Sequence, residues 1–303
     1  MPELPEVEHV VRALRRVVVG RTIIASEVRL PKLIAPLSAS AFNRRIKNST
    51  IGGISRRGKF ILIELAHDVT LPRGRASDAT RRSAGILPAK RARHAQDLTL
   101  AVHLRMTGKF VLLNTDDELP KHAHAIFYLD RDQRLVFRDQ RQFGVIKLVL
   151  STKLSQTKGI VELAPEPFGD DFTLEYLRAL LKRSHRSLKT LLLDQTKVLG
   201  LGNIYAAEAL FRARINPFKP ADELASRRVP DLHEAIREVL QFAVDHIRGS
   251  ISLEEGFSYG AAFERFWQVY EREGEPCVRC GAKIRRATQG GRSTYWCPKC
   301  QRR

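Results

Sequence analysis

Residues 1–8 of the chain read Met1-Pro2-Glu3-Leu4-Pro5-Glu6-Val7-Glu8, and the rest of the molecule is organised around this stretch. Proline is tolerated in the first turn of a helix, where its missing N–H would have no partner. Apolar residues then recur at helical spacing until Gly20 supplies a stop: Val7, Val10, Val11, Leu14 and Val18. The pattern predicts an opening helix that buries its apolar stripe and anchors the residues before it.

Pro2 also has a chemical interpretation. Removal of Met1 makes Pro2 an N-terminal secondary amine. Such amino groups titrate near roughly 7.7–8.0, so a useful fraction is neutral and nucleophilic at physiological pH. Attack on an electrophilic sugar carbon would give a covalent iminium, with Glu3 placed to transfer protons. Taken alone, the stretch favours the simpler interpretation, in which Pro2 and Pro5 only shape the entry to the helix.

Short strand-like runs separated by turn residues follow this helix. We expect strands at residues 22–30, 41–47, 60–65, 98–104, 109–113, 124–130, 134–138 and 145–150. Because strands and helices do not alternate, a β-sandwich or barrel is favoured over a Rossmann-type sheet, in an N-terminal domain over 1–151. Residues 72–97, which are rich in Arg, Ala, Ser and Gly, interrupt the domain as an insertion that we expect to be disordered.

The periodicity changes after a polar, Pro- and Gly-containing linker at 152–170. A helical domain is expected over 171–250, with Asp171 as a candidate cap. Its predicted helices lie at residues 173–182, 188–193, 204–212 and 232–247. The stretch Leu199-Gly200-Leu201-Gly202-Asn203 precedes the third of them, where backbone N–H groups suit an anion such as DNA phosphate. A Gly-x-Gly alone is weak evidence, since it also serves in ordinary turns.

All four cysteines lie close to the C-terminus, as Cys277-x-x-Cys280 and Cys297-x-x-Cys300. This spacing is typical of a closed tetrahedral site for one structural Zn²⁺, so we expect a zinc finger over 262–303. A redox dithiol is the weaker alternative. No cysteine remains for a disulfide, as in a reducing cytosol. The finger also carries cations suited to phosphate contacts: Lys283, Arg285, Arg286 and Arg292.

The chain is strongly basic, with 52 Lys and Arg against 33 Asp and Glu and a formal net charge of +19. Residues 72–97 carry seven Lys or Arg and two Asp, so removing their net +5 leaves +14 on the remainder. The natural partner is a polyanion, nucleic acid before membrane. The sequence has no stretch of about 18 apolar residues that could span a membrane, and its acidic start is unlike a signal peptide. We therefore expect a cytoplasmic protein that binds nucleic acid.

Three turns at predicted strand ends carry cations. Arg56-Arg57-Gly58-Lys59 is either a solvated loop or a turn that projects Lys59 toward a phosphate or sugar. The stretches His103-Leu104-Arg105-Met106-Thr107-Gly108 and Asp139-Gln140-Arg141-Gln142-Phe143-Gly144 each place an apolar residue near an arginine. A protein that extrudes a base must fill the hole in the stack, and an apolar wedge with a long cation suits that task. In isolation, Met106 and Phe143 are more often core residues.

In combination these motifs resemble the formamidopyrimidine-DNA glycosylase family over almost the whole chain. The shared motifs are PELPEVE at 2–8, RRGK at 56–59, HLRMTG at 103–108, GLGNIYAAEALF at 200–211 and the four-cysteine finger. The related endonuclease VIII-like enzymes usually begin Pro-Glu-Gly-Pro-Glu, so Leu4 favours the formamidopyrimidine branch.

The resemblance implies an α+β multidomain fold. It comprises an N-terminal helix with a β-sandwich, a helix–two-turn–helix domain and a Cys₄ zinc finger, with DNA in the cleft between domains. It implies a monomeric base excision repair enzyme that acts on damaged double-stranded DNA. The enzyme would remove 8-oxoguanine and formamidopyrimidines and then cleave the abasic strand by β,δ-elimination.

The resemblance also implies roles for individual residues at matching positions. Pro2 would be the nucleophile and Glu3 the proton donor, while Lys59 would serve catalysis and a flanking phosphate. Met106, Arg141 and Phe143 would fill the vacated stack. Four further residues would contact phosphates: His103, Lys189, Asn203 and Arg292. Two acidic residues, Glu6 and Glu208, would lie near the active centre.

Two departures from the family pattern bear on the substrate. Gln140 and Gln142 stand where the family commonly has Pro and Arg, and the 249–263 stretch differs from the usual loop over the extruded base. The sequence thus leaves open an alternative preference for oxidised pyrimidines. A third hypothesis, from another class, is a DNA-binding protein without catalysis that uses only the helical domain and the finger.

Overall fold

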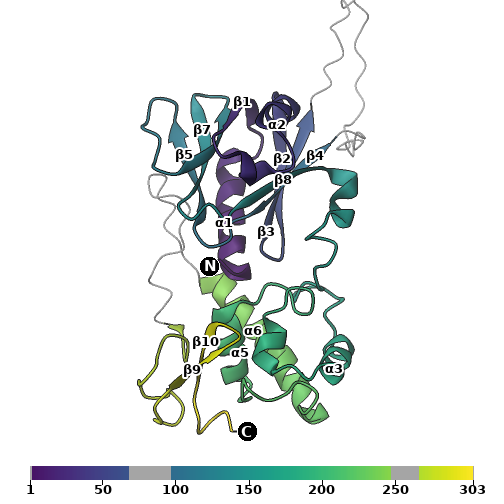
Figure 1. Ribbon diagram of the computed structural model, residues 1–303, viewed down its shortest axis with the longest axis vertical. Coiled ribbons are helices and arrows are strands. Elements are labelled where there is room, and N and C mark those ends of the chain that lie inside the picture. Colours follow the sequence, from purple (N-terminus) through teal and green to yellow (C-terminus); the bar gives the residue numbers. More distant parts are fainter. Residues whose placement is uncertain (1, 68–96, 247–265, 303) are drawn as a thin grey trace, which may run out of the picture.

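The computed structural model describes residues 2–67, 97–246 and 266–302, which form two stacked bodies (Figure 1). The upper body contains the opening helix and a large sheet, and the lower body contains helices and a small hairpin. The N-terminus lies where the two bodies meet. The expected insertion at 72–97, apart from Asp97, and the 249–263 loop lie outside the described residues.

Helix α1 (Leu4–Val18) forms as the sequence predicts and packs on an antiparallel eight-stranded sheet. The strand order is β5-β7-β6-β1-β2-β3-β4-β8. The bounds are β1 Thr22–Val28, β2 Ser49–Arg57, β3 Phe60–His67, β4 Leu98–His103, β5 Gly108–Asn114, β6 Ala123–Leu129, β7 Gln133–Asp139 and β8 Val145–Leu150.

The prediction of a strand at 41–47 is wrong, because this segment is helix α2 (Ala39–Ile46). Ser38 caps it by accepting a hydrogen bond from the Ala41 N–H at 3.2 Å, and Phe42 and Ile46 are buried one turn apart. A short apolar run does not distinguish helix from strand by its period. Strand β2, which precedes the Lys59 turn, is not among the strands expected from the sequence.

The single sheet folds over itself to make the expected sandwich. One half is β5-β7-β6-β1 and the other is β2-β3-β4-β8. Among the described residues, the halves join where β1 pairs with β2, through Thr22 with Thr50 and Ile23 with Ser49. One core contains side chains of both halves, such as Phe110 and Phe137 from one and Ile61 and Leu100 from the other. Such two-layer burial is what stabilises an antiparallel sandwich.

The lower body contains α3 (Leu174–Lys182), α4 (Leu188–Leu192), α5 (Asn203–Arg212) and α6 (Val229–His246). Short 3₁₀ turns at Pro31–Ile34, Ser151–Gln156 and Ser226–Arg228 complete the helices. The cap of α3 is Thr173, whose hydroxyl accepts from the Tyr176 N–H at 3.0 Å, and not Asp171.

Strands β9 (Arg285–Gln289) and β10 (Arg292–Trp296) form the finger hairpin. The finger packs on α5 through a cluster that contains Phe211, Val269 and Ile284. Leu4 of α1 belongs to the core of the lower body, whereas Val7 belongs to that of the sandwich. Helix α1 therefore connects the two bodies.

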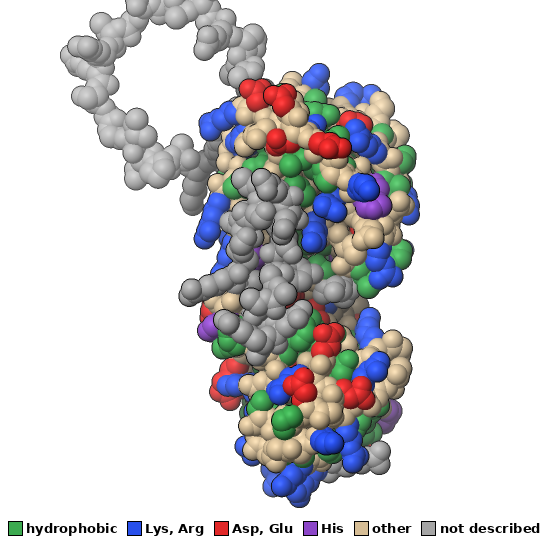
Figure 2. Space-filling view, turned by 90° about the vertical axis from the view of Figure 1, so that its left-hand side faces the viewer, with side chains coloured by type: hydrophobic (Ala, Val, Ile, Leu, Met, Phe, Trp, Pro, Cys, Tyr) green, Lys and Arg blue, Asp and Glu red, His purple; other side chains and the backbone are tan. Residues whose placement is uncertain are grey.

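In Figure 2, Lys and Arg side chains are spread over both bodies on the face shown. None of the helices in the part of the chain that the structure describes is long and apolar enough to cross a membrane.

Candidate active site and nucleic-acid interface

Glu3 is buried against the N-terminus of α5, although the two lie far apart in sequence. Its carboxylate accepts hydrogen bonds from the backbone N–H groups of Gly202 at 2.6 Å, Ile204 at 2.9 Å and Tyr205 at 3.3 Å. Unpaired N–H groups and the helix dipole favour an anion at such a position. The expectation that this loop binds DNA phosphate is wrong for these amides, because the anion they bind is Glu3.

Both glycines of the Gly-x-Gly are required by close contact with the first residues of the chain. A Cβ on Gly202 would lie 2.3 Å from Glu3 Cδ, and one on Gly200 would lie 2.5 Å from Leu4 Cδ1. Gly200 also has φ +86°, which disfavours any other residue. The Leu4 N–H donates to Gly200 O at 3.1 Å. The loop thus fixes the beginning of α1 on both sides.

Glu6 forms a second buried carboxylate beside Glu3. It accepts from the Glu3 N–H at 2.7 Å and from the Tyr205 hydroxyl at 2.5 Å. Burial, followed by the charge of Glu3, raises the pKa of Glu6 to about 7. Burial also raises the pKa of Glu3. The sequence analysis did not identify Tyr205, because a tyrosine on an apolar helix face gives no signal of its partner.

Lys59 is only 5 % exposed and points toward the same loop. Its ammonium donates to Leu201 O at 2.7 Å. Burial lowers the pKa of Lys59, while the nearby Glu3 and Glu6 oppose that shift. Gln195 organises the same carbonyl by donating to Leu201 O at 2.7 Å. Lys59 and Glu3 are thus buried together at the junction of the two bodies.

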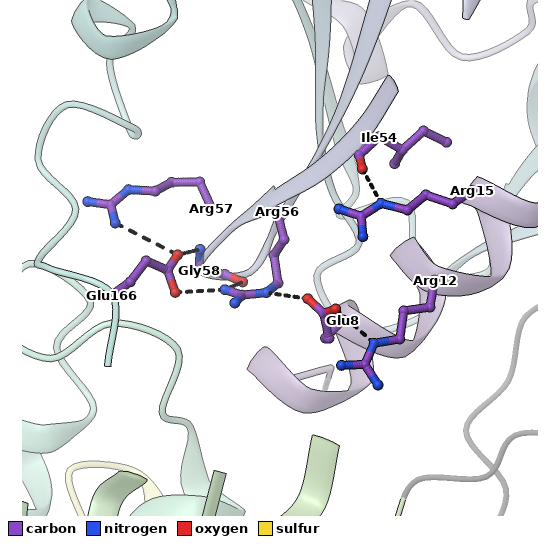
Figure 3. A network of polar contacts seen from close by, with 8 residues as sticks. All are labelled: Glu8, Arg12, Arg15, Ile54, Arg56, Arg57, Gly58 and Glu166. Atoms are coloured by element: carbon purple, nitrogen blue, oxygen red, sulfur yellow. Dashed lines mark hydrogen bonds and ion pairs between the residues drawn. The ribbon is translucent and has the colours of Figure 1, made fainter. Parts of the chain in front are cut away.

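Arg56 ties the Lys59 turn to both bodies (Figure 3). Its side chain, 11 % exposed, donates to Glu8 of α1 at 3.1 Å and to Glu166 at 2.8 Å. Glu166 also accepts from the Gly58 N–H at 2.6 Å. Net stabilisation by such a shielded ion pair is small, because the cost of desolvating the charges offsets much of their attraction. Glu166, in the segment expected to be a linker, was not identified from the sequence.

A cavity of about 500 Å³ opens where these groups meet. Six residues that the sequence analysis selected line it: Glu3, Lys59, His103, Met106, Asn203 and Arg292. Arg105, Tyr270 and Tyr295 also contribute to its wall. Cations and aromatic rings around a concave surface suit a nucleic acid with an unstacked base. Pro2 is buried next to Glu3, immediately before α1.

His103 presents a defined nitrogen to this cavity. Its Nδ1 accepts from the Arg105 N–H at 3.0 Å, and its ring lies edge-on to Phe60 with centroids 4.8 Å apart. Burial, with the charges of Arg105 and Lys59, lowers the pKa of His103 to about 3. The ring is therefore neutral at physiological pH. With Nδ1 accepting, the proton lies on Nε2, which can donate to a phosphate oxygen.

Met106 and Phe143 are not core residues. The two residues are 41 % and 51 % exposed, so neither is buried in the sandwich core. The Arg141 guanidinium lies over the Phe143 ring, 4.9 Å from its centroid. The three side chains expected to fill a vacated stack therefore project from two turns of the sandwich.

Lys189 and Asn203 both face the finger hairpin. The Lys189 ammonium donates to Ser293 O at 2.7 Å and to the Thr294 hydroxyl at 2.8 Å, and Asn203 donates to Ser293 O at 3.0 Å. Lys189 is 1 % exposed. In this structure it links the helical domain to the hairpin that carries Arg292.

Glu208 lies outside the cavity and holds the chain that enters the finger. Its carboxylate accepts from the N–H groups of Gln268, Val269 and Tyr270, at 2.9 to 3.1 Å. It lines a separate cavity of about 580 Å³ together with Phe242. Its role here is to position Tyr270, which does reach the cavity of Glu3.

The four cysteines converge as a zinc site requires. Their Sγ atoms all lie within 4.8 Å of one another, with Cys277 to Cys300 at 3.9 Å and Cys280 to Cys297 at 3.5 Å. Tetrahedral coordination at about 2.3 Å per Zn–S bond places sulfurs about 3.8 Å apart. The donor set therefore fits one Zn²⁺ with no open position.

Three family models match the chain. They are the Formamidopyrimidine-DNA glycosylase N-terminal domain at residues 1–146, the Formamidopyrimidine-DNA glycosylase H2TH domain at 163–255, and the zinc finger found in FPG and IleRS at 274–303. The formamidopyrimidine-DNA glycosylase of Pelotomaculum thermopropionicum is 43 % identical, over 100 % of this chain and 99 % of its own length.

Solved structures give the same match. The crystal structure of Lactococcus lactis Fpg with abasic-site DNA has a TM-score of 0.83 and 34 % identity, over 99 % of this chain and all of that one. A variant of the same protein bound to Fapy-dG-containing DNA has a TM-score of 0.84 and 33 % identity, over the whole of both chains.

Proposed function

The chain belongs to the formamidopyrimidine-DNA glycosylase family, and we propose that it excises oxidised purines from DNA and cleaves the strand at the resulting abasic site. Its substrates are 8-oxoguanine and formamidopyrimidines in duplex DNA, within base excision repair. The observation that carries this proposal is the joint burial of Glu3 and Lys59 beside Pro2, on a cavity lined by Arg292 and Met106.

Pro2 supplies the nucleophile once Met1 has been removed. Its nitrogen forms a bond to C1′ of the damaged nucleotide, and the bond between C1′ and the base breaks with its electron pair leaving on the base. Glu3 donates a proton to the sugar ring oxygen as the ring opens, and the Pro2 nitrogen loses its own proton to leave an iminium. Burial raises the pKa of Glu3, so this carboxylate takes up a proton, and can then donate it, more readily than an exposed glutamate.

The same iminium accounts for strand cleavage. It acidifies the hydrogens on C2′, so loss of one expels the 3′ phosphate, and a second elimination releases the 5′ phosphate. Water then hydrolyses the iminium and restores the amine. Lys59 contacts the flanking phosphate or assists proton transfer, a role supported by its ammonium, which lines the same cavity as Glu3.

The DNA interface extends from this centre to both sides. His103, Asn203 and Arg292 contact phosphates of a bent duplex in this proposal, which is supported by their position around one cavity. Met106, Arg141 and Phe143 would enter the stack that the extruded base leaves. Cys277, Cys280, Cys297 and Cys300 would hold one Zn²⁺, which shapes the finger and takes no part in bond breaking.

The test is single-turnover incision of matched duplexes that carry either 8-oxoguanine or an oxidised pyrimidine. We expect faster excision of 8-oxoguanine by about tenfold or more, as purine-specific contacts would give. A reversed preference would favour the endonuclease VIII-like alternative. Binding without incision of any lesion, by protein with an intact finger, would favour a protein that only binds DNA.

A further inference from the structure

Two residues outside the reacting centre cross-link the turns that carry the stack-filling side chains. Asp139 ends strand β7 and is 1 % exposed. One carboxylate oxygen accepts from the Thr107 hydroxyl, and the other accepts from the Gly144 N–H at 2.7 Å. The Thr107 hydroxyl in turn accepts from the Arg141 N–H at 3.0 Å. A hydroxyl can donate and accept at once, so Thr107 bridges both turns.

The backbone of these turns needs such support. Arg105 and Gln142 adopt φ values of +55° each, a left-handed conformation that costs a non-glycine residue free energy. Gly108 and Gly144 approach the Phe137 ring so closely that an added Cβ would lie 2.9 and 2.7 Å from its Cζ atom. The turns are thus fixed at their bases by contact with Phe137 and at their tops by the Thr107–Asp139 bridge.

The exposed side chains are held less firmly, since the Phe143 ring contacts the Arg141 guanidinium, which is itself exposed. Met106 and Phe143 project into solvent with 41 % and 51 % of their surface exposed. Their direction is therefore set by the backbone of the turns that carry them. A side chain that enters a base stack inserts more readily when its direction is already fixed, because ordering a mobile side chain during insertion costs free energy.

We propose that Thr107 and Asp139 are positioning residues that hold Met106, Arg141 and Phe143 as one preformed wedge. This inference rests on the proposed function. Neither Thr107 nor Asp139 need touch the reacting atoms. Their loss should slow extrusion from a stacked duplex, while chemistry on a site that is already unstacked should be spared.

The experiment compares Thr107→Val, which removes the hydroxyl at similar volume, with Thr107→Ser, which keeps it. Thr115→Val, at the exposed opposite end of β5 (Gly108–Asn114), is the matched control. Single-turnover cleavage is measured on 8-oxoguanine opposite cytosine in a duplex and on an abasic site in a single strand. A 2-aminopurine beside the lesion reports insertion of the wedge by its fluorescence.

We expect Thr107→Val to slow duplex excision about tenfold and to delay the fluorescence change, in line with loss of a bridging hydrogen bond. Single-strand cleavage should stay within about twofold, and Thr107→Ser and Thr115→Val should match wild type on both substrates. Asp139→Asn should slow duplex excision as Thr107→Val does. An amide has one acceptor oxygen, so it cannot accept from both the Thr107 hydroxyl and the Gly144 N–H as the two carboxylate oxygens do.

Two results would overturn the inference. The first is excision from the duplex by Thr107→Val at the wild-type rate. The second is an equal loss of activity on both substrates, which would show that Thr107 stabilises the folded protein as a whole and does not act on the wedge. Wild-type protein without activity on either substrate would instead contradict the proposed function itself.

Discussion

Two carboxylates, Glu3 and Glu6, are buried three residues apart at the start of α1 and differ in their surroundings. Glu3 meets three backbone N–H groups of the α5 N-terminus, whereas Glu6 meets one N–H group and the Tyr205 hydroxyl. The raised pKa of Glu6, about 7, follows from burial and from the charge of Glu3. A neutral Glu6 beside Glu3 lessens like-charge repulsion at the reacting centre.

Substitution of Glu6 should therefore change how stability depends on pH. A carboxyl whose pKa is raised from 4.5 to about 7 in the folded protein contributes stability that is fully present below pH 4.5. That contribution is lost as pH rises from 4.5 through about 7, because over this range the unfolded chain releases the proton while the folded protein still holds it. Glu6→Gln has no group that titrates here, so it does not lose this stability as pH rises. The difference in free energy of unfolding, variant minus wild type, should therefore increase by up to about 3 kcal/mol from below pH 4.5 to pH 8. Urea denaturation at four pH values measures it. Parallel curves for the two proteins would contradict the assignment.

At the scale of elements, much of the fold could be predicted because its patterns are local. Helix α1 and the four-cysteine finger follow from spacing alone. The segment at 41–47 could not be assigned, since a short apolar run fits either period. The role of the Gly-x-Gly before α5 could not be predicted, because the anion bound by the amides of Gly202, Ile204 and Tyr205 is Glu3, some 200 residues earlier in the chain.

Glu166 illustrates the same limit, since nothing in its sequence neighbourhood indicates Arg56 and Gly58 as partners. Thr107 and Asp139 likewise lie in the quoted motifs, yet the bridge between them depends on the pairing of β5 with β7. Residue types that carry chemistry could be chosen from the sequence, while the contacts that position them needed the folded chain.

Glu166→Gln should impair the turn that carries Lys59. The amide has one acceptor where the carboxylate serves both the Gly58 N–H and Arg56, so one donor loses its partner. We expect the single-turnover rate to fall about tenfold with duplex affinity within about twofold, because Lys59 moves while the DNA surface stays. Glu162→Gln is the matched control, since Glu162 accepts a local bond from the Gly159 N–H, three residues away in the same segment. Equal losses in both variants would argue against a specific role for Glu166.

At the scale of the whole molecule, α1 joins two hydrophobic cores and the finger is joined to the lower one. Leu4 packs among the helices while Val7 packs in the sandwich. Lys189 and Asn203 fasten the hairpin that carries Arg292 to the helical domain. The reacting centre thus lies at a junction that three separate parts of the chain must form together.

Removal of zinc should therefore weaken DNA binding while the sandwich stays folded. Without thiolate coordination the hairpin loses its main constraint, and Arg292 loses its defined place. We expect one zinc per molecule by elemental analysis. After chelation, affinity for a duplex with an abasic-site analogue should fall at least about tenfold. Circular dichroism should retain the β signal. Unchanged affinity in metal-free protein would show that the finger does not contribute to the interface.

The most direct test of the central claim is borohydride trapping on duplex DNA that carries 8-oxoguanine, followed by proteolysis and mass spectrometry of the cross-linked peptide. The account predicts one reduced adduct on the nitrogen of Pro2, in molecules that have lost Met1, and its absence in Pro2→Gly protein that still binds the duplex. An adduct on Lys59, or full-rate strand cleavage by protein that retains Met1, would contradict it.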